Sequence, residues 1–99
     1  MKDEKTSSRE LEFIIDILKR YGAKSISLFG SYARGDFKDD SDIDVLVEFE
    51  DTITLIDLAH IIRIVKENIG LTLDIVTKNA LSPYLSTSIE KDLTLLYSV

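Results

Sequence analysis

Apolar residues recur three or four positions apart in two stretches of the chain, and this spacing predicts two amphipathic helices. The first helix follows Ser7, which with Glu10 forms a capping box, and Gly22 provides its end. Its apolar face consists of Leu11, Ile14, Ile15 and Leu18.

The second predicted helix begins after Thr54 and ends at Gly70. Two further isoleucines, Ile56 and Ile64, fall on another side of this helix with His60 between them, and Phe13 lies off the stripe of the first helix. Single apolar residues are common on protein surfaces, but these side chains also fit a contact surface for a partner. The main apolar stripe of the second helix consists of Leu55, Leu58, Ile62, Val65 and Ile69.

Short β-like runs lie between and after these helices. Residues 43–49 (IDVLVEF) form the best of them, because their apolar residues alternate and several are β-branched. Alternation places Ile43, Val45, Val47 and Phe49 on one face, which we expect to be buried. Further strands are expected at residues 25–29, 71–76 and 93–97, and a short helix at residues 82–91.

Strands interleaved with helices predict a small α/β (α+β) domain. We expect a mixed sheet of about four strands with the helices packed on it. The 99 residues show no repeat and no Pro/Gly-rich linker, so we expect one domain over residues 1–99, with residues 1–7 flexible.

The charge balance narrows the possible functions. Eighteen acidic residues against twelve Lys and Arg give a formal net charge of −6, which argues against direct binding to nucleic acid. The absence of cysteine excludes disulfides, thiolate nucleophiles and cysteine zinc sites. No signal peptide and no apolar run of about 20 residues is present, so we expect no membrane contact and a cytoplasmic location.

The first segment with chemical potential is the turn after the strand at residues 25–29. Gly30 would allow a sharp turn and a close approach to a ligand. Ser31 offers a hydroxyl at a helix start, where backbone N–H groups favour anions, and Arg34 could add a cation with the geometry to bind phosphate. Such turns occur in many domains, so the segment alone is a weak signal.

Acidic residues on two predicted strands form the second candidate site. Asp42 and Asp44 are two residues apart and so point to one face of their strand. Asp74 lies in an apolar run, where an acid is costly unless it is paired or ligated. If the two strands are neighbours, the three carboxylates would gather, and either Mg²⁺ or proton uptake would relieve their repulsion, with Mg²⁺ the preferred interpretation. The nearby Asp36, Asp39 and Asp40 favour the alternative of a solvated acidic turn for Asp42 and Asp44.

Together these segments resemble the minimal nucleotidyltransferase family of the DNA polymerase β-like superfamily. The resemblance rests on GSYARG at residues 30–35, SDIDVLVEF at 41–49 and LDIV at 73–76. It implies that Gly30 and Ser31 hold a nucleoside triphosphate and that Arg34 contacts its β and γ phosphates. It further implies two Mg²⁺ ions bridged by Asp42 and Asp44, with Asp74 as a ligand of the catalytic ion and an aid to deprotonating the acceptor.

Stand-alone members of this length resemble the antitoxin of a pair whose toxin is a HEPN-domain ribonuclease. The resemblance implies transfer of AMP from ATP to a tyrosine of the toxin, within a hetero-oligomer. An acidic surface suits docking of a basic protein acceptor. Two alternatives remain, an antitoxin that acts by occlusion alone and a small-molecule nucleotidyltransferase whose acceptor pocket is completed by a second chain.

Overall fold

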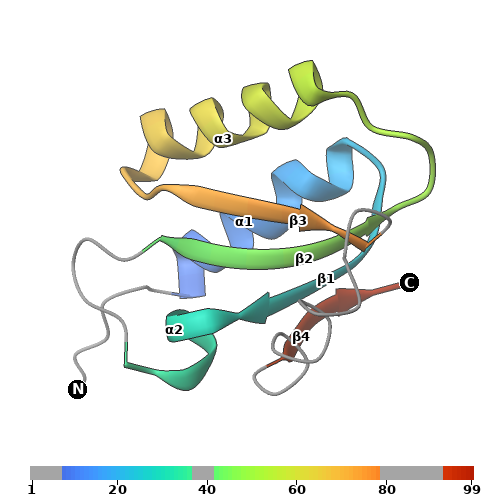
Figure 1. Cartoon of the computed structure of the whole chain (residues 1–99). Coiled ribbons are helices and arrows are strands. Elements are labelled where there is room, and N and C mark those ends of the chain that lie inside the picture. Colours follow the sequence, from blue (N-terminus) through green and yellow to red (C-terminus); the bar gives the residue numbers. More distant parts are fainter. Residues whose placement is uncertain (1–7, 37–41, 79–92) are drawn as a thin grey trace.

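A computed structural model describes residues 8–36, 42–78 and 93–99 (Figure 1). The expected Ser7 cap, the expected flexibility of residues 1–7 and the expected helix at residues 82–91 lie outside the described residues. In chain order the elements are α1 (Ser8–Arg20), β1 (Ala23–Phe29), α2 (Gly30–Arg34), β2 (Ile43–Phe49), α3 (Leu55–Ile69), β3 (Leu73–Thr77) and β4 (Thr94–Ser98).

The strands form one four-stranded mixed sheet in the order β3-β2-β1-β4. β1 pairs antiparallel with β2 and with β4, whereas β2 and β3 run parallel. The parallel pair needs a long crossover, and α3 supplies it. This architecture confirms the predicted sheet of about four strands with helices packed on it.

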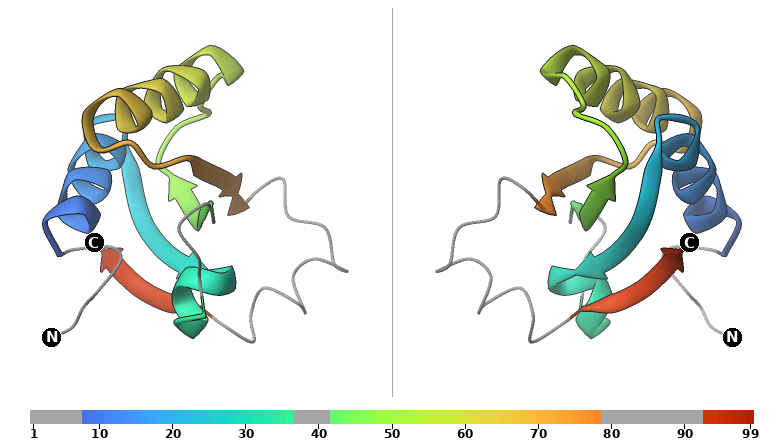
Figure 2. Two further views of the ribbon diagram at one scale, coloured as in Figure 1. Left: turned by 90° about the vertical axis from the view of Figure 1, so that its left-hand side faces the viewer. Right: turned by 90° about the vertical axis from the view of Figure 1, so that its right-hand side faces the viewer.

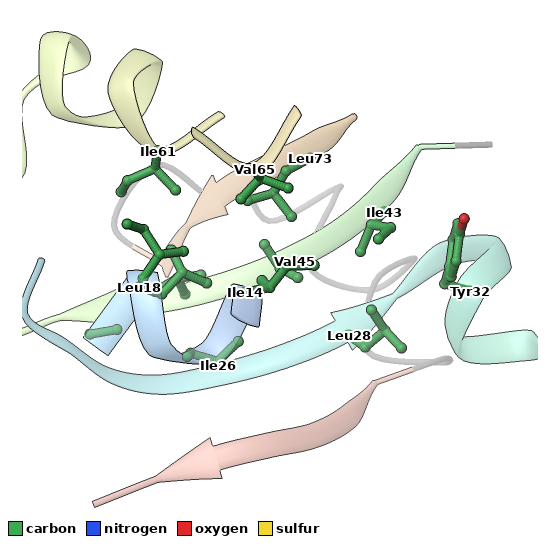
Figure 3. Packing of buried hydrophobic residues seen from close by; sticks show 13 residues of the cluster. Ile14, Leu18, Ile26, Leu28, Tyr32, Ile43, Val45, Ile61, Val65 and Leu73 are labelled. Carbon is green, nitrogen blue, oxygen red and sulfur yellow. The ribbon is translucent and has the colours of Figure 1, made fainter. Parts of the chain in front are cut away.

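Helices α1 and α3 lie side by side on one face of the sheet (Figure 2). Alternate residues of β2 point from the sheet toward these two helices. Ile43, Val45 and Val47 are fully buried there, as their alternation predicted. Figure 3 shows Ile14 and Leu18 of α1 meeting Val45 there. No helix of the described ranges covers the opposite face.

The ends of α3 are those that the sequence predicts. The Thr54 hydroxyl accepts a hydrogen bond of 3.0 Å from the backbone N–H of Asp57, and Gly70 ends the helix with a left-handed conformation. The predicted stripe is partly wrong, since Ile61 and Val65 are the buried residues and Leu55 is 83% exposed. His60 is exposed, whereas Phe13 and Ile64 pack against the core.

Strand β4 is fixed to the helical layer by an aromatic contact. The ammonium of Lys19 in α1 lies 4.7 Å from the ring centre of Tyr97, within the range of a cation–π interaction.

Within the described ranges, every helix is too short or too polar to cross a membrane.

Candidate active site

Two of the three candidate acids lie in one row across the sheet. The register pairs Phe29 of β1 with Asp44 of β2, and Asp44 in turn with Asp74 of β3. The sequence predicted this cluster only on the condition that β2 and β3 are neighbours, and the parallel pairing fulfils that condition. The row lies on the face opposite α1 and α3, because Asp44 alternates with the buried Ile43 and Val45.

Gly30 brings the main chain of α2 against this row. Its φ of +75° is in the left-handed region, which disfavours any residue with a Cβ atom. A Cβ built on Gly30 would collide with Oδ2 of Asp44 and would lie 3.2 Å from its Cγ. The turn that follows β1 and the carboxylate of β2 are therefore in direct contact, which only glycine permits.

The charges of the row and its burial shift the pKa of Asp44. Burial, the negative charge of Asp74 and a side-chain hydrogen bond with Asp74 raise the pKa of Asp44 to about 6, and the charge of Asp42 adds to the shift. The positive charge of Arg34 acts in the opposite direction. All three predicted acids and the predicted arginine therefore share one electrostatic environment.

Asp42 itself lies just before β2 and is exposed. The next residue, Ile43, donates its backbone N–H to the carbonyl of Thr72 at 2.9 Å, which ties the start of β2 to the residue before β3. This bond holds the backbone beside Asp42 close to the acid of β3. Asp42 thus adds charge at the solvent side of the row.

Ser31 and Arg34 occupy the short helix α2. The carbonyl of Ser31 accepts hydrogen bonds from the backbone N–H groups of Gly35 and Asp36, at 2.9 and 3.1 Å, so it closes the helix. The guanidinium of Arg34 pairs with the Asp36 carboxylate at 3.1 Å. The Asp36 side chain is largely exposed, and no local pattern in the sequence predicts this ion pair.

The donor set fits a hard cation in its chemistry. Among the described residues, no three His, Cys, Asp or Glu side chains are arranged as a ready metal site. Asp44 and Asp74 instead share a hydrogen bond, and a proton between two carboxyls relieves the same repulsion that Mg²⁺ would relieve. Mg²⁺ prefers oxygen ligands, and carboxylates that remain accessible to water are suitable ones. The residues Asp42, Asp44 and Asp74 therefore fit the ion.

The region that contains these site residues matches a known protein family. A family model described as a nucleotidyltransferase domain matches residues 11–96. The chain belongs to this nucleotidyltransferase family. Its matched region includes every candidate site residue, from Gly30 to Asp74. The resemblance expected from GSYARG and SDIDVLVEF is confirmed, and the chain is a transferase.

Relatives and solved structures agree with the family. The chain is 32% identical over 77 residues to the protein adenylyltransferase MntA of Thermococcus cleftensis, covering 78% of each chain. It is 43% identical over 79 residues to the protein MJ1217 of Methanocaldococcus jannaschii, covering 78% of this chain and 81% of the relative.

Among solved structures, a minimal nucleotidyltransferase superposes with a TM-score of 0.75 at 35% identity, covering 90% of both chains. A toxin–antitoxin structure with AMP-PNP gives a TM-score of 0.79 at 26% identity, covering 89% of this nucleotidyltransferase and 73% of that chain.

Sequence reasoning missed two features of the nucleotidyltransferase site. The elevated Asp44 pKa depends on strand register, which no local pattern encodes. The contact between Gly30 and Asp44 depends on the pairing of Phe29 with Asp44. Both follow from long-range pairing, although the residues themselves were recognisable in the sequence.

Proposed function

We propose that this nucleotidyltransferase is an antitoxin that transfers AMP from ATP to a tyrosine hydroxyl of a HEPN-domain ribonuclease toxin and thereby neutralises it. The observation that carries the proposal is the row of Asp44 and Asp74 in contact with the Gly30 turn. The adenylyltransferase MntA and the toxin–antitoxin structure with AMP-PNP support the nucleotide and the type of partner.

The chemistry is an in-line displacement at the α-phosphorus of ATP. The tyrosine oxygen forms a new bond to this phosphorus while the bond to the β-phosphate oxygen breaks, and pyrophosphate leaves. Asp74, which is exposed, would accept the tyrosine proton directly or through water. Neither a histidine nor a cysteine nucleophile is needed, because positioning and charge neutralisation provide most of the catalysis.

Two groups of residues in this chain would have separate roles, one in binding the triphosphate and one in binding the cations. Gly30 and Ser31 would bring backbone N–H groups and a hydroxyl to the triphosphate, and Arg34 would exchange Asp36 for the β and γ phosphates. Asp42, Asp44 and Asp74 would hold two Mg²⁺ ions, which when bound neutralise the phosphates and the leaving pyrophosphate.

Mass spectrometry of the toxin after incubation with this protein, ATP and Mg²⁺ tests the proposal. We expect the toxin to gain the mass of one or more AMP groups on tyrosine. Asp44→Asn and Asp74→Asn should each reduce the transfer rate by about 100-fold or more. Asp16→Asn, on α1 at the other side of the sheet, is the matched control and should transfer AMP as the wild type does.

A ribonuclease assay separates the proposal from occlusion. If the Asp44→Asn variant transfers no AMP but still silences the toxin at stoichiometric concentration, neutralisation is by binding alone. If the wild type transfers AMP to a small molecule and leaves the toxin unmodified, the acceptor assignment is wrong.

A further inference from the structure

A hollow lies at the end of the sheet away from the acids. It has a volume of about 550 Å³ and lies where β2 and β3 end, beside the first turn of α3. Such a volume is in the range of binding pockets rather than packing defects. Its apolar lining includes Val47, Phe49, Ile53, Leu58, Ile75 and Val76. We call this hollow the α3 groove.

Apolar side chains project from the rim of the α3 groove. Leu55, which lines the groove, is 83% exposed, and the next residue, Ile56, is 69% exposed, whereas the buried residues of the helix, Ile61 and Val65, lie in later turns. Leu55 belongs to the predicted apolar stripe, so its exposure contradicts that prediction, whereas Ile56 was expected off the stripe. Two adjacent large apolar side chains beside an apolar hollow are typical of protein–protein contact sites.

The charges around the α3 groove indicate the chemistry of its occupant. Glu48 is engaged by Lys24 and Lys78, at 3.6 Å from each ammonium. The rim also carries Asp51 and, next to it, Glu50, and both are exposed. A second copy of the chain, which carries a net charge of −6, would add like charges here. The acids Glu48, Glu50 and Asp51 outnumber Lys24 and Lys78 by one, and Glu50 and Asp51 lie beyond the two lysine pairs. The rim therefore favours a partner with cationic side chains next to an apolar segment.

The groove opens at the end of the sheet and reaches both faces. Val47, Phe49 and Ile75 line it on the helix-covered face, whereas Glu48 and Val76 line it on the face that carries the acids. Asp44 and Glu48 lie on the same strand face, about 13 Å apart along β2. Between them lie the half-buried Leu46 and, in register on β3, Val76. One surface of a folded protein can span this distance, so a partner anchored in the groove could present a hydroxyl at Asp44 and Asp74.

We propose that the α3 groove docks the protein acceptor through an apolar segment of that partner flanked by basic residues. This inference rests on the proposed function, because it takes the HEPN toxin as the partner. The groove would set the affinity for the acceptor, and the acids would carry out the transfer.

Binding of the purified toxin by calorimetry tests the inference. We expect the double variant Leu55→Ser/Ile56→Ser to bind the toxin at least about tenfold more weakly than the wild type, because it removes apolar contact without changing charge. Asp51→Lys, a second variant at an exposed site, should also weaken binding by repelling the basic partner. Leu95→Ser is the matched control, because Leu95 is 64% exposed on β4, and it should bind the toxin as the wild type does.

Kinetics distinguish docking from catalysis. The double variant should raise the KM for the toxin, leave kcat unchanged and bind AMP-PNP as the wild type does. Wild-type affinity in both the double variant and Asp51→Lys would overturn the docking assignment while leaving AMP transfer intact. Tight binding without AMP transfer by the wild type would overturn the proposed function and not the groove, and no binding by the wild type would overturn both. A wild-type dimer that the double variant dissociates would assign the groove to a second copy instead.

Discussion

Gly30 and Asp44 touch across the β1–β2 pair, so that any side chain at position 30 would enter the space of the carboxylate. The turn proposed to hold phosphate and the acid proposed to hold a cation are thus a single structural unit. A change at one must displace the other.

Gly30→Ala should therefore destabilise the fold and impair transfer together. The left-handed φ and the collision with Asp44 should cost about 1–3 kcal/mol of unfolding free energy, and displacement of the carboxylate should lower the AMP-transfer rate by about tenfold or more. Gly70→Ala is the matched control, because Gly70 has the same φ of +75° with no atom within 4 Å of a built Cβ. It should cost about 1 kcal/mol and leave transfer unchanged. Equal losses in both variants, measured by urea unfolding, would show that the contact with Asp44 has no effect.

Asp44 should titrate near pH 6 in the absence of Mg²⁺. Its pKa is raised in the folded state, so its favourable contribution to stability is complete below pH 4 and is lost as the pH rises through about 6. Carboxyl carbon chemical shifts in NMR, recorded with EDTA, measure this pKa. Asp74→Asn removes one of the repelling charges and should lower the Asp44 pKa. An unchanged Asp44 pKa in that variant would show that Asp74 does not contribute to the shift.

Arg34→Lys should weaken nucleotide binding about tenfold, since an ammonium cannot reproduce the two-pronged contact of a guanidinium with phosphate. Asp36→Asn should leave binding unchanged or tighten it slightly, because it frees Arg34 from an exposed ion pair of small energy. Fluorescence titration with an ATP analogue gives both affinities. Wild-type affinity in Arg34→Lys would remove Arg34 from the nucleotide site.

Thr54→Ala should destabilise the protein by about 1 kcal/mol, because it deletes the hydroxyl that accepts from the Asp57 N–H. Thr52→Ala, at an exposed position before the helix, is the control and should change the unfolding free energy by less than about 0.5 kcal/mol. Thermal unfolding of both variants is the measurement. A Thr54→Ala variant as stable as Thr52→Ala would show that the cap does not contribute.

Local signals in the sequence predicted most of the fold. Strand β2 has the predicted bounds, because its alternation of Ile43, Val45 and Val47 is specific to a half-buried strand. Helix α3 lies between Thr54 and Gly70, because both caps are recognisable by residue type. The candidate residues of the active site were recognisable in the same way, by the glycine turn and the acids on two strands.

Features that depend on distant parts of the chain were not predictable. Several overlapping stripes on α3 satisfy helical spacing, and only packing against α1 and the sheet selects Ile61 over Leu55. Likewise, the alignment of Asp44 with Asp74 depends on a parallel pairing that spans the whole of α3. A one-residue shift of that register would have placed Asp74 on the buried face.

Val45 and Leu46 are consecutive in the chain but belong to opposite sides of the sheet, the first sealed beneath the helices and the second beside the acids. Residues that form the core and residues that face the active site therefore alternate along one strand. A substitution at position 46 could change the surface beside Asp44 without altering a core side chain, so that the surroundings of the acids can vary while the fold is kept.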